Sequence, residues 1–332
     1  MTTKKLKKEF GEGIFLSGNA IIDRPHVVIP VSPSIDFMLG GGIPEGTLVI
    51  FAAKPKLGKT LTALDFAATA QNEKYGCDLC PKRKVFYFNI EGRLRKRDLQ
   101  GIHHLDTSEN NFVVIGSEPG NILNGNQYIK IGERLIHDNP GCVFIFDSFS
   151  QLCTAKEMDA DITDDYRPDA PKLLARLMRR LSNVIPVNKS IVIGINHIIA
   201  NQGMGMATWY EASGQKVQYQ RDVKLRGTHF DAWKDGEKQI GQKVHWVCES
   251  SAIGPPGIKM SSKIRYGYGI DKEAELLELA KDLGVIEVSG AWYKFGDNTQ
   301  KQGEHKALVY LKENPDLYND IYEQYKKATG MS

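Results

Sequence analysis

The chain has 332 residues, 41% of them apolar and 25% charged, and a formal net charge of +3. This composition is ordinary for a folded protein, and the length permits one large core with a smaller domain beside it. The small net charge creates no global field that would indicate a nucleic-acid partner, and no apolar run approaches the ~20 residues of a membrane span.

The first ten residues carry lysines with no apolar core behind them, so we expect no signal peptide and a cytoplasmic location. Five cysteines, an odd count, argue against a disulfide scaffold. Cys77-x-x-Cys80 has no second pair to complete a structural zinc site, so we favour a turn before a strand over metal binding.

Residues 4–10 predict a short basic amphipathic helix with Leu6 and Phe10 on one face. A helix this short needs a partner surface to be stable. The alternative is a frayed terminus.

From about residue 34, short apolar segments alternate with segments of helical periodicity. We predict strands at 47–52, 85–90, 112–115, 143–146 and 190–195, and helices at 60–70, 128–137 and 173–184. Because the strands are continuously apolar, they indicate a mainly parallel central sheet covered by helices on both faces. The fold class is therefore α/β.

Residues 198–216 interrupt this alternation with three glycines, two methionines and little periodicity. We therefore expect a long loop there, either functional or disordered. Further strands are expected near 223–226, 244–249 and 259–265, before a boundary near 267–270.

A compact tail follows this boundary. We predict a helix at 272–283 stopped by Gly284 and a hairpin around Ser289-Gly290. Asn314-Pro315 would open a last helix that reaches about residue 327.

The segment A-K-P-K-L-G-K-T lies at 53–60, between a predicted strand and a predicted helix. Its backbone N–H groups can wrap phosphates at a helix N-terminus. Lys59 would reach the terminal phosphates of ATP, and the Thr60 hydroxyl would bind Mg²⁺. The alternative is a chance match on a basic loop. We assign the nucleotide contacts to Ala53, Lys54, Pro55, Lys56, Leu57, Gly58, Lys59 and Thr60. Ala53 replaces the usual first glycine, which is tolerable at negative φ.

Asp147 ends the apolar strand at 143–146 and is followed by Ser148, and we add both residues to the nucleotide site. This position is the carboxyl edge of the sheet, where open α/β folds bind ligands. It suits a carboxylate in the Mg²⁺ shell. Many buried strands end in Asp, so the pairing with the phosphate loop supports the assignment.

Glu91 follows the strand at 85–90 at the same edge, where it could position or activate the attacking water. The alternative is a helix-capping acid or an ion-pair partner of Arg93, Arg95 or Arg97.

His197, preceded by Asn196, ends the strand at 190–195. It could sense the terminal phosphate and pass that state to the loop that follows. A lone histidine at a strand end is otherwise structural.

Together these residues resemble the RecA-type strand-exchange recombinases, in particular their phage-encoded (UvsX-like) relatives. K-K-E-F-G-E-G-I at 7–14 resembles the family's N-terminal polymerisation segment, and F-I-F-D-S at 144–148 and I-N-H at 195–197 match in order and spacing. Bacterial members usually carry Gln where His197 stands. G-A-W-Y at 290–293 and L-K-E-N-P at 311–315 look like the family's C-terminal domain.

The resemblance covers nearly the whole chain and implies three parts. They are an N-terminal polymerisation segment at 1–33, a RecA-like phosphate-loop ATPase core at 34–267, and a small α+β C-terminal domain at 268–332. It also implies that Lys59, Glu91 and His197 are catalytic and that Thr60 and Asp147 hold the metal.

Two DNA-binding loops are implied, one near 161–168 and one at 198–216. The implied DNA contacts are Arg167, Arg176, Asn201, Gln202, Gly203, Met204, Gly205 and Met206. Glycines allow close backbone approach to phosphates, and the methionines could wedge between bases. A solvated helix face explains Arg176, Arg179 and Arg180 equally well.

The function implied is that of an ATP-dependent recombinase that polymerises on single-stranded DNA and pairs it with homologous double-stranded DNA. ATP and Mg²⁺ would be its cofactors, and single-strand-binding and loader proteins further partners. Its location would be the bacterial cytoplasm, or the host cytoplasm if the chain is phage-encoded.

The chain departs from the family pattern in three places. Family members carry two cations just after the strand at 244–247 that reach the neighbouring subunit's ATP, whereas 248–251 reads C-E-S-S here. Lys259, Lys263 or Arg265 would replace them, or hydrolysis would be slow. The end K-K-A-T-G-M-S is not acidic, and Trp209-Tyr210 adds aromatic surface to the second loop.

Two other functions use the same features. A hexameric helicase of the DnaB type shares the core, but the tail at 268–332 argues against it. A filament protein or regulator with little turnover would explain the cations that are missing at 248–251.

Overall fold

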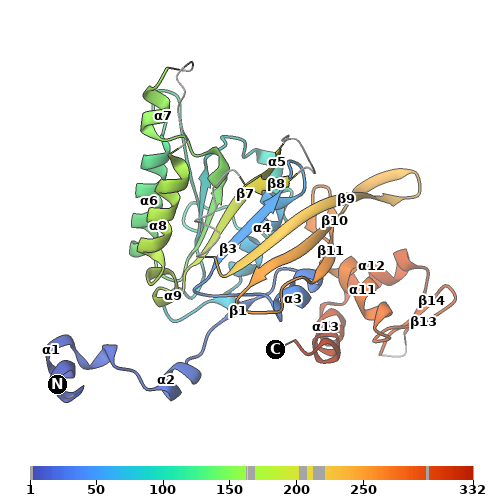
Figure 1. Ribbon diagram of the computed structural model, residues 1–332. Helices are drawn as coiled ribbons and strands as arrows, with labels where there is room; N and C mark the ends of the chain where they lie inside the picture. Colours follow the sequence, from blue (N-terminus) through green and yellow to red (C-terminus); the bar gives the residue numbers. More distant parts are fainter. Residues whose placement is uncertain are drawn as a thin grey trace.

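The computed structural model describes residues 3–161, 163, 169–201, 208–211, 221–296 and 299–331, with only the backbone for 199–201 and 208–211. Within these ranges the main feature is a ten-stranded sheet of order β12-β11-β10-β9-β3-β7-β6-β4-β5, to which β8 adds by pairing with β7. The α/β fold class is confirmed, with the mainly parallel region in the middle of the chain (Figure 1).

The parallel half of the sheet carries the apolar strands predicted from the sequence. They are β3 (Leu48–Ala53), β4 (Val85–Asn89), β5 (Phe112–Gly116), β6 (Val143–Asp147) and β7 (Ile191–Asn201). Neighbouring strands in this half pair in parallel. Their residues alternate between two core clusters, one on each face of the sheet.

Helices cover both faces of the parallel half. One face packs against α4 (Lys59–Ala70), and the other against α6 (Gly125–Asp138), α8 (Ala170–Leu181) and α9 (Val184–Val187). This two-sided cover explains why the strands are apolar at every position rather than at alternate ones.

The second half of the sheet is antiparallel beyond β9. It consists of β9 (Val223–Asp235), β10 (Lys238–Ser251), β11 (Lys259–Arg265) and β12 (Gly269–Ile270), and β9 pairs in parallel with β3. The predicted strands at 223–226 and 244–249 are much too short, because one long hairpin joins them. Asp235-Gly236, a strong hairpin signal, marks its turn.

The loop predicted at 198–216 is wrong in part. β7 continues through the β-branched Ile198-Ile199 to Asn201, and β8 (Thr208–Glu211) pairs with it in antiparallel register. Isoleucine and the aromatic pair Trp209-Tyr210 favour strands, which explains the extension.

The C-terminal unit begins with α11 (Lys272–Asp282), and Gly284 follows it with a φ of 73°, as predicted. The hairpin around Ser289-Gly290 is also confirmed. Its strands are β13 (Glu287–Ser289) and β14 (Trp292–Lys294), and β15 (Gln300–Gln302) adds a third strand that was not predicted.

Two helices complete this unit. α12 (Glu304–Glu313) was not predicted, whereas α13 (Pro315–Thr329) was, with proline in its first turn. The Asn314 side chain does not cap α13 but donates to the Tyr310 carbonyl, at 2.7 Å. A separate apolar core joins the three helices to the small sheet.

The N-terminal segment contains α1 (Thr3–Phe10), a 3₁₀ turn at Glu12–Ile14 and α2 (Gly18–Ile22), none of which has a buried residue. The predicted short helix is confirmed, and the segment extends away from the rest of the chain (Figure 1). It ends at β1 (Val28–Ile29), which pairs with β2 (Ile43–Pro44) beside α3 (Pro33–Leu39).

The remaining elements are short. They are α5 (Lys96–Gln100), α7 (Ala155–Asp159) and 3₁₀ turns at Glu73–Tyr75 and Phe149–Gln151. None of the helices in the described ranges combines the length and apolar character that a bilayer crossing requires.

Candidate nucleotide-binding and catalytic site

The loop between β3 and α4 has the backbone that a phosphate loop requires. β3 ends at Ala53 in extended conformation, and α4 begins at Lys59. Gly58 has a φ of 70°, and a Cβ there would lie 2.4 Å from Ile264 Cδ1, so a side chain is excluded on both counts. Ala53 is therefore acceptable at its position, whereas Gly58 is required at its own.

The Lys59 side chain folds back into this loop. Its ammonium donates to the carbonyl oxygens of Ala53 and Lys54, at 3.0 and 2.9 Å. Burial lowers the pKa of Lys59 to about 8, although Asp147 and Glu91 favour its charged form. A buried cation held by neutral carbonyls is well placed to exchange them for phosphate oxygens.

Thr60 and Asp147, the two predicted metal ligands, lie in direct contact. The Thr60 hydroxyl donates to Asp147 Oδ2 at 2.7 Å, and the Tyr87 hydroxyl donates to the same oxygen at 2.6 Å. Burial raises the pKa of Asp147. A hydroxyl and a carboxylate are hard oxygen donors, so this pair fits Mg²⁺.

Glu91 and His197 form a second contact at the same sheet edge. His197 Nε2 lies within hydrogen-bonding distance of Glu91 Oε1, to which the Ser148 hydroxyl also donates, at 3.0 Å. The bond to His197 is the main reason that the pKa of Glu91 is lowered. Arg93 lies 3.8 Å from Glu91 but is largely exposed, so the ion pair considered from the sequence is the weaker contact.

The backbone around His197 is fixed by Ser150, whose hydroxyl accepts the His197 N–H at 2.6 Å. The ring atom Nδ1 is buried and makes no hydrogen bond with any described residue. Tyr87 and Ser150 were not identified from the sequence. A tyrosine in the middle of an apolar strand was the signal available for Tyr87.

The structure describes only two of the predicted DNA contacts. Arg176 lies exposed on α8, and the Asn201 backbone ends β7. Arg167, Gln202, Gly203, Met204, Gly205 and Met206 lie outside the described residues. Their assignment stays a prediction.

Two cations of the adjacent strand lie beside the segment 248–251, in which the cations of the family pattern are missing. Lys224 and Arg226 of β9 both pair with Glu249, Lys224 at 2.5 Å. Two of the candidates considered from the sequence are paired at α11. Lys263 pairs with Glu278 of this helix, and Arg265 pairs with Asp271, the residue before it. Lys259 is exposed on β11, opposite Val247 of β10.

The predicted turn at Cys77-x-x-Cys80 is present, since these two residues form an isolated antiparallel bridge. Cys142, at the start of β6, brings its sulfur to 3.8 Å from that of Cys80. All five cysteines are free.

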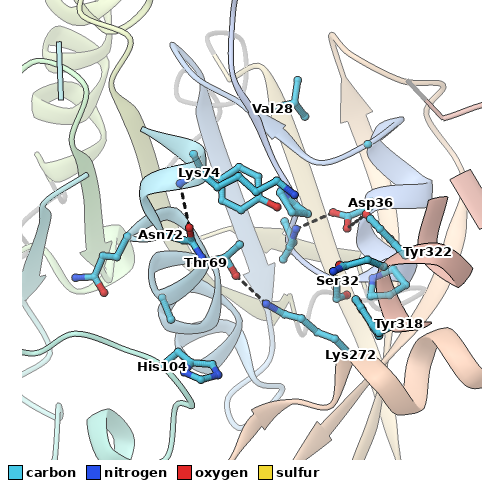
Figure 2. A pocket seen from close by; sticks show the side chains of 18 of the residues that line it. Val28, Ser32, Asp36, Thr69, Asn72, Lys74, His104, Lys272, Tyr318 and Tyr322 are labelled. Carbon is cyan, nitrogen blue, oxygen red and sulfur yellow. Dashed lines mark hydrogen bonds between the residues drawn. The ribbon is translucent and has the colours of Figure 1, made fainter. Parts of the chain in front are cut away.

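A cavity of about 930 Å³ lies away from the phosphate loop, at the opposite end of α4 (Figure 2). Polar groups of the core and of the C-terminal unit meet there. Tyr322 donates to Asp36 and Lys272 donates to Thr69, each at 2.7 Å. These bonds tie α13 and α11 to the core, so the cavity belongs to the junction between the two units.

The fold and this site define a phosphate-loop protein of the α/β class, with a hydroxyl–carboxylate pair and a carboxylate–histidine pair at one sheet edge. Residues 1–271 match the RecA N-terminal domain family, and residues 274–330 match the RecA C-terminal domain family. The chain therefore belongs to the RecA family, whose members are DNA-dependent ATPases of recombination and repair.

Curated relatives agree along the whole chain. Protein RecA of Geobacter sulfurreducens is 28% identical over 335 residues, covering 100% of this chain and 94% of that protein. Protein RecA of Lactobacillus johnsonii is 27% identical over 331 residues, covering 99% and 88%. Protein RecA of Bacillus velezensis is 27% identical over 334 residues, covering 100% and 92%.

Proposed function

We propose that this protein is an ATP-dependent recombinase that forms a filament on single-stranded DNA and catalyses homologous pairing and strand exchange. The observation that carries the proposal is the contact between Glu91 and His197. His197 lies on β7, which runs without interruption to Asn201, within the predicted DNA loop at 198–216. One strand thus joins the hydrolysis site to the DNA site.

Each polar residue at the carboxyl edge of the parallel strands has a role in this proposal. Lys59 and the loop amides bind the phosphates of ATP, and Thr60 and Asp147 hold Mg²⁺, which supplies charge neutralisation. Glu91 accepts the proton of the attacking water, and Ser148 orients its carboxylate. Tyr87 holds Asp147 in place.

DNA would be bound mainly through its backbone, with sequence read by base pairing between strands. Arg167, Arg176, Asn201 and the segment 202–206 are the proposed contacts. The N-terminal segment 1–33 would join successive copies through its exposed apolar side chains, which are Phe10, Ile14, Leu16, Ile21 and Ile22.

We extend the proposal to the partner proteins and to the cellular location. Single-strand-binding and loader proteins would assist assembly on DNA in the bacterial cytoplasm. His197 supports placement in the phage-encoded (UvsX-like) branch, and the host cytoplasm would then be the site of action.

A strand-exchange assay with matched and mismatched duplexes tests the proposal. We expect product only from the matched duplex, with ATP and single-stranded DNA present. Lys59→Ala should abolish nucleotide-dependent filament extension in electron micrographs, whereas Glu109→Gln, at an exposed position of the core, should leave it unchanged. Equal yields from both duplexes would refute strand exchange as the function.

A filament regulator with little turnover is a second candidate. The pairing of Glu249 with Lys224 and Arg226 favours it, because these two cations beside the 248–251 segment are already paired within their own chain. Measuring ATP turnover with and without single-stranded DNA separates the two functions. A turnover that DNA does not raise would favour the regulator.

If turnover is DNA-dependent, we propose Lys259 as the cation that reaches the neighbouring copy. It is exposed, whereas Lys263 and Arg265 are engaged within their own chain. Lys259→Ala should then lower turnover by orders of magnitude without lowering Tm. Lys263→Ala should lower Tm, and equal turnover losses in both variants would remove the case for Lys259.

A further inference from the structure

Three side chains with metal-ligand chemistry meet on the antiparallel half of the sheet, away from the phosphate loop. They are His229 and Asp231 of β9 and His245 of β10, and their ligand atoms all lie within 4.8 Å of one another. Within the described ranges, no other group of three His, Cys, Asp or Glu side chains satisfies this distance. The cluster plays no part in the nucleotide site.

The strand register brings these residues together. His245 pairs directly opposite His229 in the β9–β10 hairpin. Asp231 is two residues from His229 and therefore points to the same face of the sheet. The hairpin is the long ribbon that projects from the sheet in Figure 1. Backbone hydrogen bonds between strands, rather than a loop, thus position all three side chains.

The side chains are already oriented toward one another. The rings of His229 and His245 stack with centroids 4.1 Å apart and an interplanar angle of 9°. His245 Nε2 lies 2.7 Å from Asp231 Oδ2.

Hydroxyl groups engage the other ring nitrogens. His245 Nδ1 lies 3.0 Å from the hydroxyl of Ser261, its register partner on β11, and His229 Nδ1 lies 2.9 Å from the hydroxyl of Thr228. In each ring, Nε2 is left as the candidate ligand. Outer hydrogen bonds of this kind fix the tautomer and the orientation of metal-binding histidines.

We propose that His229, Asp231 and His245 bind one divalent transition metal ion, with Zn²⁺ as the best match. Two imidazole nitrogens and one carboxylate oxygen form a typical zinc donor set, whereas Mg²⁺ prefers oxygen ligands.

The distances in the cluster suit this ion. Tetrahedral bonds of 2.0–2.1 Å place ligand atoms about 3.3 Å apart. The separations in the cluster, from 2.7 Å to at most 4.8 Å, bracket this value. Asp231 is largely exposed, so it can rotate to reach the geometry.

His229 and His245 line a groove of about 380 Å³, together with Arg226, Lys259 and Met260. Three protein ligands leave a fourth tetrahedral position open, and the groove gives room for water or another donor there. The alternative is that His245 and Asp231 form only an exposed ion pair beside the stacked His229 ring. Such a pair contributes little to folding stability.

Zn²⁺ titration of the full-length, chelator-treated protein, in competition with a chromophoric chelator, tests this proposal. We expect one site. His229→Gln, Asp231→Asn and His245→Gln should each weaken it by at least ~100-fold, and Ser261→Ala by about tenfold. His305→Gln, which alters an exposed histidine of α12, should bind as the wild type does.

Co²⁺ gives an independent readout. The proposed site predicts visible d–d bands without a thiolate-to-cobalt charge-transfer band, whereas a site at Cys77 and Cys80 would show that band. Far-ultraviolet circular dichroism checks that each variant is folded. Wild-type affinity in the three ligand variants, loss of binding in Cys77→Ser, or no Zn²⁺ binding at all would overturn the proposal.

Discussion

The two halves of the central sheet place side chains in different ways. In the parallel half, every strand ends at one edge, so Ala53, Glu91, Asp147 and His197 gather there although up to 144 residues separate them. In the antiparallel half, strand ends alternate between edges, and neighbours meet across the strands instead. His229 meets His245 in this way.

This difference in placement separates side chains that can act on a ligand from side chains that stabilise the fold. At the carboxyl edge of the parallel half, polar groups pair mainly with one another and can be exchanged for a ligand. At the amino ends of the same strands, the buried ion pair between Arg83 and Glu45 lies beside β4. The antiparallel half joins the core to the C-terminal unit, through Lys243, Lys263 and Arg265.

The largest effect is expected at the carboxyl edge. Glu91→Gln keeps the shape of the side chain but removes the proton acceptor, so DNA-dependent ATP turnover should fall by about 10²–10⁴. Nucleotide affinity should be nearly unchanged, because Lys59, Thr60 and Asp147 are intact.

Turnover assays and equilibrium binding of a fluorescent ATP analogue measure the two quantities separately. Glu109→Gln, at an exposed position, is the matched control. A parallel loss of affinity would show that Glu91 positions the loop rather than the reaction.

The amino end of the parallel half should show the largest loss of stability. The Arg83 side chain is fully buried, donates to the Gly141 carbonyl and pairs with Glu45, which is 2% exposed. Arg83→Met leaves that carboxylate with only Lys189, at 3.6 Å, and should cost about 3–5 kcal/mol of unfolding free energy.

Urea denaturation measures this loss. Lys294→Met breaks the exposed pair with Glu287 in the small C-terminal sheet and should change the unfolding free energy by no more than about 1 kcal/mol. Similar losses in both variants would mean that the buried pair has no special role.

Tight packing in the parallel half predicts a smaller loss of stability. A Cβ on Gly194 of β7 would lie 2.1 Å from Phe149 Cε2 and 2.8 Å from Ile50 Cδ1. Gly194→Ala should therefore destabilise the protein by about 1–3 kcal/mol. Gly296→Ala has no atom within 4 Å of the new Cβ and should leave Tm nearly unchanged.

A further effect on stability is expected from pH, at the junction with the C-terminal unit. Burial raises the pKa of Asp36 and of Glu275 to about 7 each. The folded chain then holds more protons than the unfolded chain between about pH 4 and pH 7, so unfolding free energy falls as pH rises through this window and levels off above it.

Urea unfolding midpoints measured between about pH 4 and pH 7 test whether stability falls as pH rises. Asp36→Asn should flatten the slope, because the amide cannot ionise. A slope that is unchanged in Asp36→Asn and Glu275→Gln would place the pH dependence elsewhere, for example at histidines.

These contrasts explain which features could be predicted from the sequence. A strand followed by Asp147 or His197 is a local pattern, and parallel pairing brings such ends together without further information. The pairing of His229 with His245 depends on register, which the hairpin turn at Gly236 and the bulges along β9 and β10 determine. The contact of Tyr87 with Asp147 requires knowing that β4 and β6 are neighbours.

β7 changes its partners between Gly194 and Ile198. It pairs with β6 up to Gly194 and with β3 up to His197, and from Ile198 onward with β8. His197, which contacts Glu91, is therefore the last residue of β7 that pairs with β3 before the β7–β8 ribbon begins. The four residues from Ile198 to Asn201 extend about 13 Å beyond His197, so a rotation of about ten degrees at His197 would displace Asn201 by about 2 Å.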